Sequence, residues 1–177
     1  KVKFLPVEPT LQSYKAVFEY RAIWVGYKNS IVYTVLGTLF SVALTLLAAY
    51  PLSREDLRGG KAFMALFLFT MMFSGGLIPT YLLVKNLGLV NTMWAVILPG
   101  SVSAYNVIVA RTFFRQNIPQ ELLEAAKVDG CSDFRFFMSI VIPLSMPIVA
   151  VLALWVAVGL WNSYFNPMIY LNSENKY

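Results

Sequence analysis

Four long stretches of the sequence are apolar and contain no charged side chain, and they constrain the fold more than any other feature. They lie at residues 30–50, 62–84, 93–110 and 140–161. A helix of about 20 apolar residues crosses the hydrocarbon core of a bilayer. Only 13% of the residues are charged, whereas about a quarter are charged in a soluble domain. The sequence therefore predicts an integral membrane protein with four spans at these positions, the third ending near residue 112.

The four stretches are predicted to be helices. Strands of a membrane barrel alternate polar and apolar residues over segments of about ten residues, and no such alternation occurs here. Taken together, the four stretches contain many Leu and Ala residues and several Met residues, as in helices. We expect an all-α fold, a polytopic bundle of membrane helices.

The basic residues predict which ends of the spans face the cytoplasm. Segment 51–61 carries three of them and segment 111–139 carries four, whereas the loop at 85–92 contains only Lys85. Cytoplasmic loops are enriched in Lys and Arg, so the first two segments are expected inside. Membrane topology thus explains the net charge of +5 better than binding to nucleic acid, which is not expected as a partner.

Residues 1–28 are expected to form an external or interfacial segment, with an amphipathic helix possible at 11–20. Five basic residues in the first 29 positions conflict with an external location. A further span before Lys1 would remove this conflict. We therefore expect the sequence to be a fragment of a longer protein, with residues 29–177 forming a transmembrane domain.

The chemistry of most enzymes is not supported by the composition. Histidine is absent, and Cys131 is the single cysteine, which excludes His-based nucleophile pairs and thiolate metal clusters. All nine carboxylates lie outside the apolar stretches. An intramembrane hydrolase would need a base beside Ser101, Ser103 or Asn106, and none is adjacent. We expect no catalytic residue, no metal site and no cofactor in this chain.

A short polar segment at 117–139 separates the last two apolar stretches and is predicted to be a hairpin of two helices. Pro119 can start the first helix, and Gly130 stands where a left-handed residue would end it. Ser132 can cap the helix that follows. A helix this short is marginal alone, so either the membrane domain or a partner must hold it. An ordinary cytoplasmic loop is the alternative.

The first helix of the hairpin is predicted to be amphipathic. One side of the helix is apolar and contains Leu122, Leu123 and Ala126. The other side is charged and contains Glu121, Glu124 and Lys127. The small side chains of Ala125 and Ala126 would allow a partner to approach closely. Phe134, Phe136 and Phe137 on the next helix are expected to offer anchors for that partner.

Motif spacing in this hairpin resembles that of a known family. Glu124-Ala125-Ala126 is followed by three residues, Gly130, nine residues and Ile140-Val141-Ile142-Pro143. This is similar to the EAA motif of ABC importer permeases, written EAA, three residues, G, nine residues, I-x-L-P. Ile142 in place of Leu is the only departure, and it nearly conserves volume.

The resemblance extends from about residue 29 to 166 and implies a type I importer permease of the MetI-like fold. Four shorter segments, at 78–81, 87–92, 113–119 and 161–162, also resemble the carbohydrate-uptake branch, and in particular its second maltose-type permease. They are less specific than the motif in the hairpin. Permeases of this branch typically have six spans, which implies that the first and last spans are absent here.

What the resemblance implies about partners is specific. The hairpin would dock on a cytoplasmic ABC ATPase dimer through Glu124, Ala125, Ala126, Gly130, Ile140 and Pro143. No phosphate-binding loop of the G-x-x-x-x-G-K-[ST] type occurs in the chain, so ATP would be hydrolysed by that separate subunit. A second permease and an extracytoplasmic solute-binding protein would complete a sugar importer of a bacterial-type plasma (inner) membrane. A permease for amino acids, peptides or ions would share the hairpin, and a structural scaffold protein would bind nothing there.

Polar residues within the third apolar stretch are candidates for a substrate path. Ser103, Tyr105 and Asn106 follow Pro99-Gly100 in quick succession. Lipid cannot satisfy such groups, so they are expected to face another helix or a wet cavity. We expect Tyr105 and Asn106 to line the path, with Ser103 nearby.

Overall fold

The computed structural model describes residues 11–173, and all regular elements in this part of the chain are helical, as predicted. Its helices are α1 (Gln12–Glu19), α2 (Arg21–Ser53), α3 (Gly60–Met72), α4 (Leu77–Asn86), α5 (Met93–Ile97), η1 (Leu98–Gly100), α6 (Ala104–Asn117), α7 (Gln120–Val128), α8 (Asp133–Phe136), η2 (Phe137–Val141), α9 (Ile142–Leu144), α10 (Met146–Trp161) and α11 (Phe165–Tyr170).

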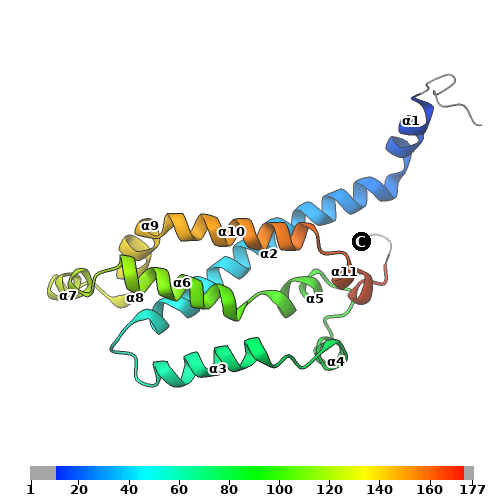
Figure 1. Cartoon of the computed structure of the whole chain (residues 1–177). Helices are drawn as coiled ribbons and strands as arrows, with labels where there is room; N and C mark the ends of the chain where they lie inside the picture. Colours follow the sequence, from blue (N-terminus) through cyan, green and yellow to red (C-terminus); the bar gives the residue numbers. More distant parts are fainter. Residues whose placement is uncertain (1–10, 174–177) are drawn as a thin grey trace, which may run out of the picture.

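The helices form an elongated bundle organised by α2, which packs along α10 and α6. Figure 1 shows α7, α8 and α9 gathered at one end of this bundle and α4, α5 and α11 at the other. The loop from α2 to α3 returns at the same end as α7 and α8 (Figure 1). The two basic segments expected on the cytoplasmic side, 51–61 and 111–139, therefore lie at one end of the molecule.

Helix α2 is longer than the span predicted at 30–50. It runs without interruption from Arg21 to Ser53, so the boundary expected near residue 28 is not an element boundary. Pro51, where the helix was expected to stop, lies in its last turn. Because proline removes the bond to the carbonyl four residues earlier but leaves the following residues free, the helix can continue briefly. The helix expected at 11–20 is confirmed as α1.

Within residues 11–173, α2 is the one helix long and apolar enough alone to cross a membrane, and up to four spans result if each bent pair of helices counts as one. The stretch at 62–84 forms α3 and α4, which are bent by 113°. Gly76 between them has φ 84° and ψ 177°, a conformation that is essentially restricted to glycine. The single span predicted at 62–84 is therefore not one straight helix.

The third apolar stretch is also broken, between η1 and α6, with a bend of 55°. A break exposes backbone groups that lipid cannot satisfy. Ser41 on α2 compensates one of them, because its hydroxyl donates a 2.6 Å hydrogen bond to the Ser101 carbonyl. Both residues are buried. The contact joins the break to the longest helix of the bundle.

The fourth stretch, predicted as one span at 140–161, turns a corner at Ser145. Residues Asp133–Leu144 and α10 are bent by 79°. Just before the corner, η2 is a π-helical turn, which shifts the hydrogen-bond pattern and makes room for the ring of Pro143. Pro147 occupies the first turn of α10, where proline is favoured. Residues 140–144 thus belong to the hairpin, and α10 begins only at Met146.

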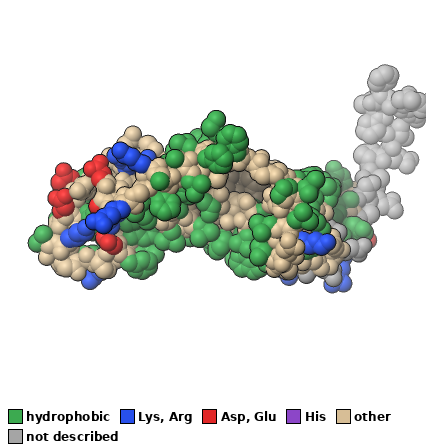
Figure 2. All heavy atoms as spheres, turned by 90° about the horizontal axis from the view of Figure 1, so that it is seen from below, with side chains coloured by type: hydrophobic (Ala, Val, Ile, Leu, Met, Phe, Trp, Pro, Cys, Tyr) green, Lys and Arg blue, Asp and Glu red, His purple; other side chains and the backbone are tan. Residues whose placement is uncertain are grey.

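The main core lies between the hairpin and the adjoining ends of α2, α6 and α10. Its most completely buried large side chains include Phe114, Phe136, Val141 and Leu152. Elsewhere many large apolar side chains are exposed, and α3 has no buried residue. Figure 2 shows apolar side chains over the middle of the molecule and most of the visible acidic ones at one end. This distribution agrees with helices immersed in lipid.

Candidate functional site

The hairpin turn has the geometry that its glycine predicts. Gly130 has φ +73° and follows the last turn of α7. Its amide donates to the Lys127 carbonyl at 3.0 Å, and the Cys131 amide donates to the Ala126 carbonyl at 2.9 Å. These two bonds define a Schellman motif, which ends a helix at a left-handed residue. The expected helix end at Gly130 is confirmed.

The second arm begins with the expected serine cap. The Ser132 hydroxyl accepts a hydrogen bond of 3.3 Å from the Arg135 amide. Asp133 occupies the first turn of α8, where a negative charge is favourable near the helix N-terminus. Both arms are therefore ended and started by local interactions, which makes the hairpin a defined element and not an irregular loop.

Helix α7 presents a charged face to solvent and packs Leu123 and Ala126 on the core as predicted, but Leu122, predicted on the same apolar side, is 40% exposed. Glu124 is exposed and accepts a 3.1 Å hydrogen bond from Gln120 Nε2. Ala125 is exposed, but Ala126 is only 8% exposed and packs into the main core. The two alanines do not form one outer surface as expected, because adjacent residues on a helix point about 100° apart. Val128, 88% exposed, extends the outer face instead.

The phenylalanines of the second arm divide between core and surface. Phe136 and Phe137 are 1% and 4% exposed, whereas Phe134 is 65% exposed. The Phe137 ring lies 5.0 Å from that of Tyr50 at the end of α2. The expectation of three outward anchors is therefore wrong for Phe136 and Phe137, which bind the hairpin to its own membrane domain. Only Phe134 is available to a partner.

The last two residues of the motif lie outside the α7 face. Ile140 is half-buried against the main core, and Pro143 is exposed just before the corner at Ser145. The Ser145 hydroxyl is buried and has no hydrogen-bond partner among the described residues. The motif thus combines an outer surface, a turn and a connection to α10. Its residues do not form a single contact patch.

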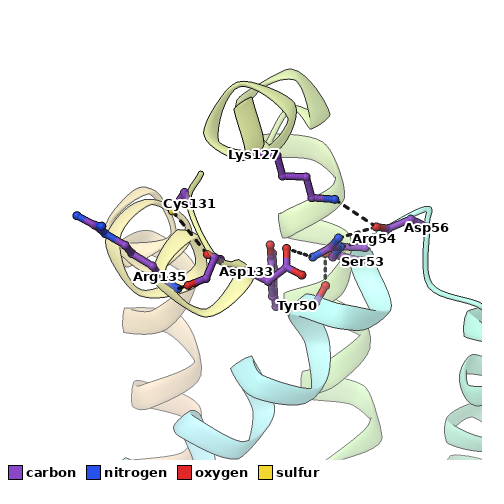
Figure 3. Close-up of polar contacts among 9 residues, drawn as sticks. Tyr50, Ser53, Arg54, Asp56, Lys127, Cys131, Asp133 and Arg135 are labelled. Carbon is purple, nitrogen blue, oxygen red and sulfur yellow. Dashed lines mark hydrogen bonds and ion pairs between the residues drawn. The ribbon is translucent and has the colours of Figure 1, made fainter. Parts of the chain in front are cut away.

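Ion pairs join the hairpin to the loop that follows α2 (Figure 3). Arg54 Nη1 lies 2.7 Å from Asp133 Oδ1, and Arg54 Nε donates to Asp56 Oδ1 at 2.8 Å. Lys127 Nζ lies 3.9 Å from Asp56 Oδ2. The hydrogen bonds from Arg54 lower the pKa of Asp56 and those to Asp56 raise the pKa of Arg54, so both groups remain charged near neutral pH.

Sequence reasoning used Arg54 only as a marker of topology and did not pair it with the hairpin. The signal available was weak: an arginine one turn beyond a span, with an aspartate two residues later. Its partner Asp133 lies 79 positions away in sequence. A cavity of about 310 Å³ lies beside this network, and both Arg54 and Glu124 contribute to its lining.

The candidate path residues are only partly brought together. Asn106 lines a cavity of about 270 Å³ between α2, α6 and α10, together with Ser41 and Trp155. Tyr105 is 51% exposed, and its ring lies 5.9 Å from that of Trp155. Ser103 is half-buried at the start of α6. Neither Tyr105 nor Ser103 lines this cavity, so Asn106 is the one candidate placed in it.

Helices broken within the bundle, together with a capped polar hairpin at its charged end, define the fold of a type I ABC importer permease. The chain belongs to the family described as "Binding-protein-dependent transport system inner membrane component", which matches residues 21–172. The predicted family and fold class are thereby confirmed. Members of this family are transport subunits of membranes.

Relatives and a solved structure are similar over nearly all of the chain. The polygalacturonan/rhamnogalacturonan transport system permease protein YtcP of Bacillus subtilis is 45% identical over 100% of this chain and 62% of its own length. The arabinooligosaccharides transport system permease protein AraQ of Halalkalibacterium halodurans is 32% identical over 98% of this chain and 63% of its own length. A chain of a bacterial ABC transporter involved in import of the acidic polysaccharide alginate matches with a TM-score of 0.92 at 34% identity, over 99% of this chain and 62% of that one. The chain therefore spans somewhat under two thirds of these relatives.

Proposed function

We propose that this chain is the membrane-spanning part of a permease subunit in an ATP-driven importer of oligosaccharides or related glycosides. The names of the similar proteins support a carbohydrate, since they refer to polygalacturonan/rhamnogalacturonan, arabinooligosaccharides and alginate. An external solute-binding protein would deliver the substrate, and a second permease would complete the path across a bacterial-type inner membrane.

The observation that carries this proposal is the construction of the hairpin. Its outer face presents Glu124, Ala125 and Val128 to solvent, whereas Ala126 and Phe136 are buried in the membrane domain. A surface element held from behind by its own core can transmit force, because it cannot yield independently of that core. We therefore place a cytoplasmic ATPase dimer on this face, as the subunits that hydrolyse ATP. Its closure would bias the permeases between inward-open and outward-open states.

Charge reversal on the outer face of α7 tests the docking assignment. Glu124→Lys in the full-length assembled transporter should lower the amount of co-purified ATPase about tenfold, because it replaces the negative charge on the docking face. The matched control is Glu19→Lys, the same change on α1 at the opposite end of the bundle, where we expect no loss. If Glu124→Lys retained both the ATPase and transport, docking through this face would be refuted.

We also propose that Asn106 contributes to the substrate path, because its side chain borders the cavity between α2, α6 and α10. Asn106→Ala should reduce sugar uptake by about threefold to tenfold, with ATPase assembly unchanged, since it removes one polar partner of the sugar. Thr112→Ala is the control, because Thr112 lies on the same helix and its hydroxyl donates to the Ile108 carbonyl one turn earlier in that helix. Equal uptake by both variants would exclude Asn106 from the path.

A further inference from the structure

Arg54 is the structural link between the longest helix and the hairpin. It follows α2 directly, and its side chain is only 16% exposed although it lies in a polar loop. Two of its guanidinium nitrogens, Nε and Nη2, donate to the two carboxylate oxygens of Asp56, and Nη1 donates to Asp133. Such bidentate, charge-assisted hydrogen bonds fix geometry as well as contribute energy. In Figure 3 the guanidinium lies between the two carboxylates.

This network reaches both arms of the hairpin. Asp133 belongs to α8, and Lys127 of α7 lies 3.9 Å from the same Asp56 carboxylate that Arg54 binds. The covalent chain connects the hairpin to α6 on one side and to α10 on the other. It has no direct covalent connection to α2. Polar contact with α2 is made at its end, through Arg54 and Asp56.

We propose that Arg54 is a positioning residue that makes α2 move together with the hairpin. This inference rests on the proposed function and adds to it a route by which force would reach α2. An exposed ion pair would contribute little. The carboxylates of Asp56 and Asp133 are 54% and 59% exposed, but Arg54 itself is largely covered, donates three hydrogen bonds and stands beside the contact of Tyr50 with Phe137. Since the chain already joins the hairpin to α6 and α10, which pack on α2, the Arg54 link gives α2 a direct connection to the hairpin as well.

Arg54→Gln tests the link in the full-length assembled transporter. The variant should keep the same amount of co-purified ATPase, because the outer face of α7 is unchanged. Transport per ATP hydrolysed should fall about tenfold, because the polar part of the link is lost and only the apolar contact of Phe137 with Tyr50 then joins the hairpin to the end of α2. Arg58→Gln is the matched control: it removes the same charge from the same loop, and Arg58 is exposed and forms no ion pair with any described residue. The control should transport as the unmodified protein does.

A double-mutant cycle separates this role from general stabilisation. Asp133→Asn removes the negative charge that pairs with Arg54 at the hairpin but leaves Arg54 paired with Asp56, and it serves as the test if Arg54→Gln fails to assemble. We expect Asp133→Asn to lower transport per ATP, and the double variant Arg54→Gln/Asp133→Asn to be no worse than Arg54→Gln alone. Additive losses, or unchanged transport per ATP in either single variant, would overturn the proposal. Loss of ATPase binding in Glu124→Lys is independent of these outcomes, so the proposed function can stand while the Arg54 link fails.

Discussion

Replacement of Phe136 by alanine is expected to lower the free energy of opening of the hairpin by about 3–5 kcal/mol, which is the range for deleting a large buried aromatic side chain. Phe136 is 1% exposed and lies in the main core with Phe114 and Leu152. The cavity left behind would remove packing contacts between the hairpin and the membrane domain. Amide hydrogen exchange of residues 120–144 in the assembled protein measures the opening directly.

The control for this prediction is two positions away on the same helix. Phe134 is 65% exposed, so Phe134→Ala should change hydrogen exchange by no more than about 0.5 kcal/mol, as is usual at the surface. It should instead weaken ATPase binding, because Phe134 is the aromatic side chain that the second arm presents outward. Equal exchange in the two variants would show that Phe136 does not anchor the hairpin.

Gly130→Val should abolish coupled transport by disrupting the turn between the two arms. The φ of +73° is strongly unfavourable for a β-branched residue, with strain of about 1–3 kcal/mol. Space is not the obstacle, because an added Cβ would meet nothing within 4 Å. Relief of the strain requires rotation of the turn, and rotation breaks the bonds to the Ala126 and Lys127 carbonyls. We expect faster hydrogen exchange at Cys131 and loss of ATPase co-purification.

Gly130→Asn distinguishes backbone strain from any contact that the glycine makes with a partner. Asparagine adopts the left-handed conformation far more readily than valine, so this variant should retain the turn and the larger part of transport. If Gly130→Asn and Gly130→Val were equally inactive while the turn stayed intact, close approach of the ATPase would be the reason for the glycine. Thermal stability should be nearly unchanged in the asparagine variant.

Local signals in the hairpin could be predicted from the sequence, because they depend on few residues. Gly130 and Ser132 follow rules of helix capping that operate over four or five positions. The charged side of α7 was also predictable from its periodicity. The inward position of Ala126 and Phe136 was not, because which face of a short helix is buried depends on elements distant in sequence. The pairing of Arg54 with Asp133 could not be predicted for the same reason, because the two residues are 79 positions apart in the sequence.

Breaks in the apolar stretches were only partly predictable. Glycine and proline near Gly76 and Pro143 indicate where a helix can bend, but the angle depends on packing against neighbours. The hydrogen bond from Ser41 to the Ser101 carbonyl shows why one break is tolerated. Hydropathy reports how apolar a stretch is but not whether its helix bends. It therefore predicted one straight span at 140–161, although the chain turns by 79° at Ser145. The number of membrane crossings remains a prediction.

The corner at Ser145 makes an L-shaped lever of the segment Asp133–Leu144 and α10. The short arm is roughly 18 Å long at 1.5 Å per residue, and it lies nearly perpendicular to the long arm, at 79°. A sideways push on its far end would therefore twist α10 about its own axis and not slide it lengthwise. Moving the far end of the roughly 18 Å arm sideways by about 5 Å would rotate α10 about its axis by roughly 15°. Trp155 on α10 would sweep across the cavity beside Asn106, so torque applied at one end of the bundle would reshape its interior.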